Sequence, residues 1–280
     1  MNFRKSLLAG AAVVFAAGAL GCSADLTAPS QIDDAQVNAD IAASAGETVA
    51  SELAGFADHT AAAGSFTKMA PSYSLSVGAG GASQLTPLSS SCSYAAGRYT
   101  CTASSENGLS VSRSFAFYDA NGGTLQTFDA TKVESVNFQA QLDGSFQKDL
   151  FWTLGIHRTR NATVSGLISQ SPHRVWNGVG AGADTLTHVG LDGIRSLAGN
   201  SADTVTNVVM AGAGNYTPLS GTVVVAVDYT ASIQGAAATA SKQVKTRAVV
   251  TFDGTQSPAL QLGNLHCLLH LDTHRVDSCQ

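Results

Sequence analysis

The side chains best suited to metal binding gather near the C-terminus of this 280-residue chain. Imidazole and carboxylate groups are common metal ligands, and four of them stand at even-numbered positions: His266, His270, Asp272 and His274. At the two-residue period of a β-strand, all four point to one face. Positions four residues apart on a strand lie about 13 Å apart, which is too far to share one ion.

A metal site would therefore need a neighbouring pair, such as His270 with Asp272, and ligands from another strand (His157, His173 or His188). Without such partners the group is a solvated polar face, and this is the interpretation that we favour. We predict no metal and no other cofactor. His266, His270 and Asp272 are the residues from which a metal site would have to start.

Motifs of nucleophilic catalysis and of nucleotide binding do not occur in the sequence. There is no Gly-x-Ser-x-Gly elbow. The run Gly178-Val-Gly-Ala-Gly-Ala lacks the third glycine of a dinucleotide-binding loop at the required spacing, and no strand–helix–strand context surrounds it. We interpret residues 177–184 as a flexible loop. The sequence assigns no catalytic residue and favours a non-catalytic protein.

Arg113 stands on the apolar face of an alternating segment, residues 109–117. A guanidinium at the margin of a sheet can extend its charged end to solvent. Inside a barrel lumen it would instead need anionic partners, and it could then bind an anionic or lipid-like ligand. Trp152 and Trp176 could line such a pocket, although each is also a good core residue.

Five cysteines, an odd number, call for an explanation in an exported protein. Cys92 and Cys101 flank a hairpin pattern, and a two-residue turn at Ala96-Gly97 would place them opposite each other at disulfide distance. Cys267 and Cys279 would close a C-terminal hairpin in the same way. Two disulfides, Cys92–Cys101 and Cys267–Cys279, predict an oxidising compartment and leave Cys22 over.

The N-terminal residues 1–21 have the pattern of a signal peptide. Arg4 and Lys5 precede an uncharged apolar stretch, residues 7–20, that is too short for a comfortable transmembrane helix. The stretch leads into Ala19-Leu20-Gly21-Cys22, which resembles the lipobox of bacterial lipoproteins. The match departs from the family pattern at one place, because the family prefers Leu three positions before the cysteine, where Ala19 stands.

This resemblance implies that residues 1–21 are removed and that the thiol of Cys22 carries acyl chains at the mature N-terminus. Two or three acyl chains would anchor the protein durably to a membrane. Ser23, in place of Asp, is compatible with passage to the bacterial outer membrane. The alternative is an ordinary secretory signal cleaved near Gly21, which would leave Cys22 as a spare thiol.

Apolar periodicity divides the mature chain into three parts. Residues 22–32 form a lipidated tether, residues 33–58 a helical segment, and residues 84–280 one β domain. Apolar residues recur every fourth position in the helical segment, namely Val37, Ile41, Ala45, Val49 and Leu53. Gly46 leaves open whether this segment is one kinked helix or two short ones.

The β domain alternates apolar and polar residues, as in Val223, Val225, Val227 and Tyr229. Turn signals such as Asn121-Gly122 and Asp143-Gly144 separate the strands. We therefore predict a mainly β fold, an antiparallel meander of about ten strands. So many strands should form a curved sheet, a barrel or a sandwich.

Composition excludes some functions and leaves others open. With 15 basic and 20 acidic residues, the chain has no basic face for nucleic acid. We expect an exported protein whose membrane partner is reached through the lipid, with an unidentified protein or hydrophobic ligand as further partner. The first hypothesis is a non-catalytic envelope lipoprotein with a structural or binding role. The alternatives are a carrier or chaperone of a hydrophobic ligand in a half-open β-barrel, and an envelope hydrolase or metal-dependent enzyme.

Overall fold

The structure is a computed structural model that describes residues 32–63 and 92–280, apart from short gaps. The gaps are at 107, 128, 130, 148–150, 169–172, 191–192, 211–216, 236–238, 274 and 278. The predicted signal peptide, Cys22 and nearly all of the tether lie outside the described residues.

A long helix opens the described chain. Helix α1 (Asp34–Ala63) is capped by Asp33, whose Oδ1 accepts a hydrogen bond from the Ala35 amide at 2.9 Å. The five apolar residues predicted to share one face are all buried: Val37, Ile41, Ala45, Val49 and Leu53. The structure therefore confirms which face of this helix enters the core.

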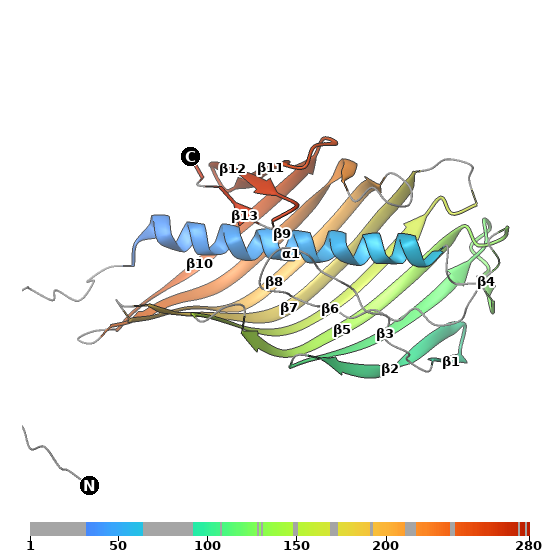
Figure 1. Cartoon of the computed structure of the whole chain (residues 1–280), viewed down its shortest axis with the longest axis horizontal. Coiled ribbons are helices and arrows are strands. Elements are labelled where there is room, and N and C mark those ends of the chain that lie inside the picture. Colours follow the sequence, from blue (N-terminus) through green and yellow to red (C-terminus); the bar gives the residue numbers. More distant parts are fainter. Residues whose placement is uncertain are drawn as a thin grey trace, which may run out of the picture.

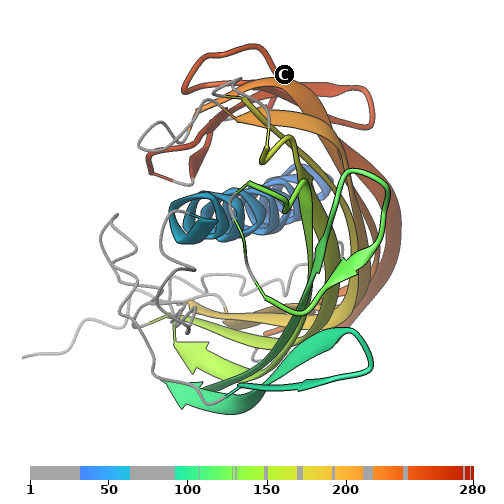
Figure 2. The same ribbon diagram turned by 90° about the vertical axis from the view of Figure 1, so that its right-hand side faces the viewer.

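The rest of the described chain is one antiparallel sheet in which almost every strand pairs with its sequence neighbours. Its strands are β1 (Cys92–Ala95), β2 (Arg98–Glu106), β3 (Leu109–Tyr118), β4 (Thr124–Leu125), β5 (Ser135–Gln147), β6 (Trp152–Ser165), β7 (Arg174–Gly190), β8 (Gly193–Met210), β9 (Pro218–Gln234), β10 (Thr239–Phe252), β11 (Ala259–Leu262), β12 (Leu265–His270) and β13 (Arg275–Val276). The predicted mainly β, antiparallel meander is confirmed. The sheet is strongly curved but is not closed into a barrel (Figures 1 and 2).

Helix α1 lies in the hollow of the curved sheet, as Figure 2 shows. The inner face of the sheet is apolar at both ends of the strand path, with Phe115 and Phe138 on one side and Val225 and Val250 on the other, all buried in the same core. An antiparallel sheet commonly packs one face on a core and exposes the other. Here α1 fills that core, so the sheet needs no second sheet to cover its inner face.

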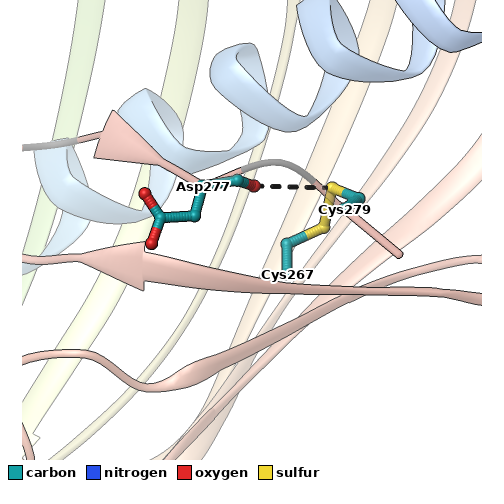
Figure 3. Close-up of a disulfide and its surroundings, with 3 residues drawn as sticks. All are labelled: Cys267, Asp277 and Cys279. Atoms are coloured by element: carbon teal, nitrogen blue, oxygen red, sulfur yellow. Dashed lines mark hydrogen bonds between the residues drawn. A yellow bond between two sulfur atoms is a disulfide. The ribbon is translucent and has the colours of Figure 1, made fainter.

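Both predicted disulfides are present. Cys92 pairs with Cys101 across the hairpin of β1 and β2, with Cα atoms 3.9 Å apart. The hairpin turns at Ala96-Gly97, where both residues have positive φ, as a two-residue turn of this kind requires. The disulfide between Cys267 and Cys279 ties the C-terminal end of the chain to β12 (Figure 3). Two such bonds indicate an oxidising, exported environment.

The structure decides between the two alternatives that Gly46 left open for the N-terminal segment, in favour of one helix. Residues 34–63 form one unbroken helix that is longer than the predicted segment. Gly46 is instead a point of close packing, because an added Cβ would lie 2.8 Å from Cγ2 of Val276 and 3.2 Å from Cδ1 of Leu269. The missing side chain lets the disulfide-tied C-terminal hairpin rest against α1.

Two predicted loops or turns are strands. Asp143 and Gly144 continue β5, where Gly144 has a φ of 140° and pairs with Leu109 of β3. Residues 177–184 are the centre of β7, not a flexible loop. Alternate glycines at 178, 180 and 182 stand on the inner face of β7, where the backbones and side chains of β6 and β8 come too close for a Cβ. Glycine was mistaken for a sign of flexibility where it marks close approach.

Gly182 gives a direct test of this explanation. An added Cβ would lie 2.3 Å from the backbone oxygen of His157 and 2.4 Å from Cγ of Arg158. We therefore expect Gly182→Ala to lower the free energy of unfolding by about 1–3 kcal/mol, the usual cost of overpacking. The measurement is urea unfolding followed by circular dichroism.

Gly155→Ala is the matched control, since Gly155 lies inside the neighbouring strand β6 and its added Cβ would make ordinary contact with Cβ of Thr185 at 3.7 Å. This variant should be neutral, or stabilising by up to about 1 kcal/mol. Equal losses in both variants would contradict the close-approach explanation of the β7 glycines.

Candidate functional site

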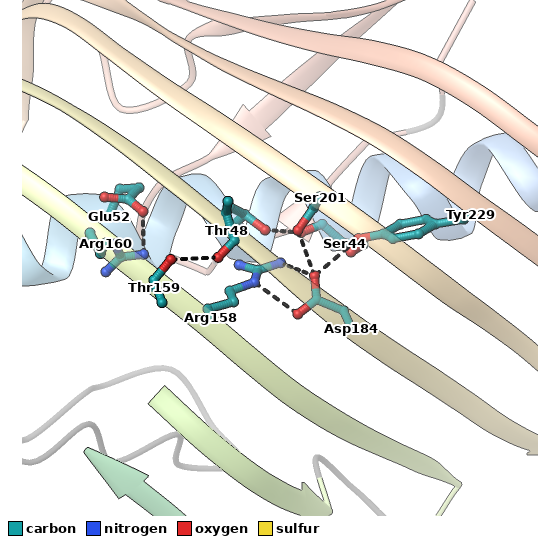
Figure 4. A network of polar contacts seen from close by, with 10 residues as sticks. Ser44, Thr48, Glu52, Arg158, Thr159, Arg160, Asp184, Ser201 and Tyr229 are labelled. Carbon is teal, nitrogen blue, oxygen red and sulfur yellow. Dashed lines mark hydrogen bonds and ion pairs between the residues drawn. The ribbon is translucent and has the colours of Figure 1, made fainter. Parts of the chain in front are cut away.

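Five charged side chains meet where α1 crosses the middle of the sheet. We call this set the buried charge network, and Figure 4 shows most of its members. Its members come from four elements: Glu52 from α1, Arg158 and Arg160 from β6, Asp184 from β7, and Asp203 from β8. All three carboxylates are buried. Charges in such a place must be paired or neutralised.

Arg158 and Asp184 form the best-defined pair of the network. Nε of Arg158 donates to Oδ1 of Asp184 at 2.8 Å, and Nη2 donates to Oδ2 at 2.5 Å. Ser201 and Tyr229 also donate their hydroxyl hydrogens to Oδ2 of Asp184, at 2.8 Å and 3.2 Å. Burial opposes the charge of Arg158, but these hydrogen bonds and the charge of Asp184 hold the pKa of the guanidinium above its usual value. Four hydrogen bonds therefore hold this half of the network together.

Glu52 has a different protonation behaviour. Its carboxylate forms an ion pair with Arg160 and is 1% exposed. The pKa of Glu52 is raised to about 7, chiefly by burial; the charge of Arg160 opposes this rise, and the charge of Asp203 adds to it. The carboxyl of Glu52 therefore changes its protonation near neutral pH.

Counting charges explains why a proton is held here. Two arginines face three carboxylates, so the fully ionised network would carry one excess negative charge in the interior. One proton on Glu52 removes that excess. Protonated Glu52 can donate to Asp203, whose Oδ2 is buried and has no other hydrogen-bond donor among the described residues.

The buried charge network is poorly placed for catalysis, because α1 covers it. Thr48 is also buried on this face of the helix, one turn before Glu52, where its hydroxyl donates to the Ser44 backbone oxygen at 3.0 Å. The ion pair between Glu52 and Arg160 joins α1 directly to β6. The arrangement fixes the position of the helix on the sheet, a role that buried polar groups fill in other proteins.

A cavity of about 270 Å³ lies near the start of α1. We call it the α1 cavity. It is bounded by the first turns of the helix and by the ends of β7, β8 and β9, and its apolar wall includes Val37, Leu197 and Ala231. Asp40, His188 and Arg195 add charged or titratable groups to the lining. A small number of polar groups in an apolar hollow is typical of a ligand site.

Arg195 is the distinctive group of the α1 cavity. Its Nη2 lies 3.8 Å from Oδ1 of Asp40, so the two make a long ion pair without a close hydrogen bond. The Nε–H of Arg195 is buried and donates to no described group. Burial raises the pKa of Asp40, and the charge of Arg195 offsets this only in part. The lining of the cavity therefore includes Arg195, with a hydrogen-bond donor that no described group accepts from, and the partly desolvated carboxyl of Asp40.

The C-terminal histidines are not gathered into one site. His266 and Asp272 are exposed, and His274 lies outside the described residues. His270 is held by Ser257, 3.0 Å from its Nδ1, and by Asp277, 2.8 Å from its Nε2. Among the described residues, no three His, Cys, Asp or Glu side chains come together as metal ligands would.

The predicted ligand residues are also dispersed. Arg113 is partly buried on β3, opposite Cys101 and Ala140 rather than in the buried charge network. Trp176 is fully buried and stacks on Phe138 with ring centroids 6.2 Å apart, so it belongs to the core. The Trp152 side chain lies outside what the structure describes. Neither Arg113 nor Trp176 lines the α1 cavity.

Sequence reasoning missed both arginines of the buried charge network. The signal was present, because β6 alternates Leu154, Ile156, Arg158, Arg160, Ala162 and Val164 on one face. This is the pattern that singled out Arg113. Arg195 carried no comparable signal, since its role depends on Asp40, which is far away in the sequence.

The pKa of Glu52 makes stability depend on pH. An unfolded carboxyl has the ordinary value of 4.5, whereas native Glu52 titrates near 7. Between these values the native state holds a proton that the unfolded state has lost, so stability falls as pH rises through this window and is level above it. From pH 5 to pH 8 this contribution should decline by about 2–3 kcal/mol.

We expect Glu52→Gln to remove that decline, as measured by urea unfolding at both pH values. Asp228→Asn is the matched control, because Asp228 is a surface carboxylate that pairs with Lys245 at 2.8 Å. It should keep the full decline of the wild type. If Glu52→Gln keeps the decline too, another group holds the proton.

The part of the chain that the structure describes contains no helix with the length and hydropathy needed to cross a membrane.

Comparison with known proteins supplies no functional assignment. No protein-family model matches the chain, and no curated protein or solved structure was found to be similar to it.

Proposed function

We propose that this chain is a lipid-anchored, non-catalytic protein of the bacterial cell envelope that binds a small ligand in the α1 cavity. The observation that carries the proposal is Arg195, which lines a hollow large enough for a small molecule and whose buried Nε–H donates to no described group. Leaving a buried donor unsatisfied costs about 1–3 kcal/mol. A ligand with an acceptor group would recover that energy.

The lining of the α1 cavity suggests the chemical class of the ligand. At about 270 Å³ the cavity is slightly smaller than the usual pockets for drug-sized molecules. Val37, Leu197 and Ala231 would contact an apolar body, and Arg195 would bind a carboxylate or a similar acceptor. A small amphipathic molecule with one acceptor end fits this combination.

The envelope location rests on two independent features. The disulfides indicate an oxidising, exported environment. Residues 19–22 supply the lipobox-like ending that would make Cys22 the acylated N-terminus, and Ser23 is compatible with the outer membrane as the destination. Because the chain is acidic overall, anionic headgroups would not hold it, and the lipid would have to be the anchor.

A second candidate is a carrier of a hydrophobic ligand, and the position of α1 favours it. The helix fills the hollow where an acyl chain would lie, and much of its buried face is small or polar, including Ala42, Ala45 and Thr48. A ligand could take the place of α1 on the inner face of the sheet. Bound fatty acid or phospholipid, in place of a small polar molecule, would favour this carrier.

Ligand binding is tested by native mass spectrometry of the full-length protein purified from bacterial membranes. We expect a bound small molecule on the wild type and its loss in Arg195→Ala. Arg247→Ala is the control, because Arg247 is an exposed arginine of β10 outside the cavity. A ligand-free wild type, or equal binding by Arg195→Ala, would contradict the assignment of the cavity.

The anchor is tested separately by Cys22→Ser in the full-length chain. We expect the wild type to carry acyl mass on its N-terminal cysteine and to sediment with membranes. The variant should lose the acyl mass and enter the soluble fraction, since no other acylation site is proposed. Unchanged mass and sedimentation in Cys22→Ser would show that the lipobox interpretation is wrong.

A further inference from the structure

Three exposed apolar side chains lie together at one end of the sheet, and we call them the apolar tip. They are Phe151, Val189 and Ile194, which are 58%, 50% and 42% exposed. Val189 of β7 pairs with Ile194 of β8, and the Val189 amide donates to the Phe151 backbone oxygen at 2.9 Å. The three residues are thus neighbours across the ends of β6, β7 and β8.

A grouping of apolar side chains, not a lack of charge, distinguishes this end of the sheet. Lys148, Asp149 and Asp192 stand close to the tip residues in the sequence. At the opposite end, Asp119, Asp129 and Asp253 each accept a hydrogen bond from a backbone amide two residues further on. Ile168, which follows β6 at that end, is 38% exposed, less than each member of the apolar tip.

Helix α1 begins at the end of the sheet that bears the apolar tip. Asp34 forms an ion pair with Lys242 near the start of β10 at 2.5 Å, and Asp40 lies beside Arg195 of β8. In Figure 1 the start of α1 lies at the same side of the molecule as the start of β10. From Ile32 back to Cys22 the chain has ten residues, which can span at most about 36 Å. An acyl group on Cys22 would therefore keep this end of the sheet close to the bilayer.

We propose that the apolar tip contacts the lipid bilayer and, together with the acylated Cys22, orients the sheet with its tip toward the membrane. The inference rests on the proposed lipid anchor. Phenylalanine and branched aliphatic side chains gain free energy by entering the headgroup–acyl boundary. Since the anchor already holds the protein there, the tip needs to add only orientation, not affinity.

Tryptophan reporters test the proposal in the full-length protein, purified and reconstituted into phosphatidylethanolamine–phosphatidylglycerol vesicles that carry brominated acyl chains. Val189→Trp places the reporter in the tip. Val179→Trp is the matched control, since Val179 is a valine of the same strand and of similar exposure (55%), about 33 Å further along the strand. The fluorescence of the wild-type protein in the same vesicles is subtracted from the fluorescence of each variant.

We expect bromine to cause a loss of the added fluorescence of Val189→Trp, because a side chain at the acyl boundary contacts the brominated chains, and to leave Val179→Trp unchanged. Quenching of both reporters would mean that the sheet lies flat on the bilayer, and quenching of neither would mean that the tip stays in water or meets a protein. Either result overturns the proposal.

Intact mass of the same preparations separates failure of the inference from failure of the anchor. If the protein is acylated but Val189→Trp is not quenched, the proposed membrane contact of the apolar tip is wrong, whereas the proposed acylation of Cys22 is supported. If the mass shows no acyl group, the anchor is wrong, and the protein is then added to preformed brominated vesicles. Quenching there still supports the tip, and its absence overturns the tip as well.

Discussion

A curved, open sheet of this length has one face that must be covered, and helix α1 supplies that cover. The sheet buries Val223, Val225 and Val250 on its inner side, and within the described part of the chain no second sheet packs against them. Once α1 occupies the hollow, every charged residue of the inner face has to find a partner on the helix or on a neighbouring strand. The buried charge network, the β7 glycines and the contact at Gly46 all follow from this constraint.

The buried charge network shows how the helix is positioned. Apolar contacts of alanine and valine are tolerant of small shifts, whereas Glu52 meets Arg160 in only one register of helix on sheet. The glycines of β7 belong to the same arrangement, because they leave the room that Arg158 and Asp203 occupy. The position of α1 on the sheet and the protonation state of the buried charge network thus both depend on Glu52.

The proposed ligand site and membrane contact lie at the start of α1. The α1 cavity, the start of the helix and the apolar tip share one end of the sheet, which is the end that the tether would approach from Cys22. A ligand in the cavity would then sit near the membrane surface. The C-terminal disulfide, by contrast, holds the end of the chain near β12 and Gly46, in the middle part of α1.

Much of the fold could be predicted from local pattern. Alternation identified the strands through Val223 and Tyr229, the spacing of Val37 and Leu53 identified the buried helix face, and the cysteine spacings identified both disulfides. The candidate site could not be predicted in the same way. Arg195 and Asp40 are 155 residues apart in the sequence, and no local period connects a helix residue with a strand residue so distant.

The sequence by itself determined which residues face the core, because side-chain periodicity is a property of the local backbone. It also determined the hairpins that the disulfides close. Only the tertiary structure decided that α1 enters the hollow of the sheet, that glycines 178, 180 and 182 mark close packing instead of a loop, and that Glu52 holds a proton near neutral pH. These outcomes depend on burial and on distances between segments far apart in the chain, and both arise when the sheet curves around the helix.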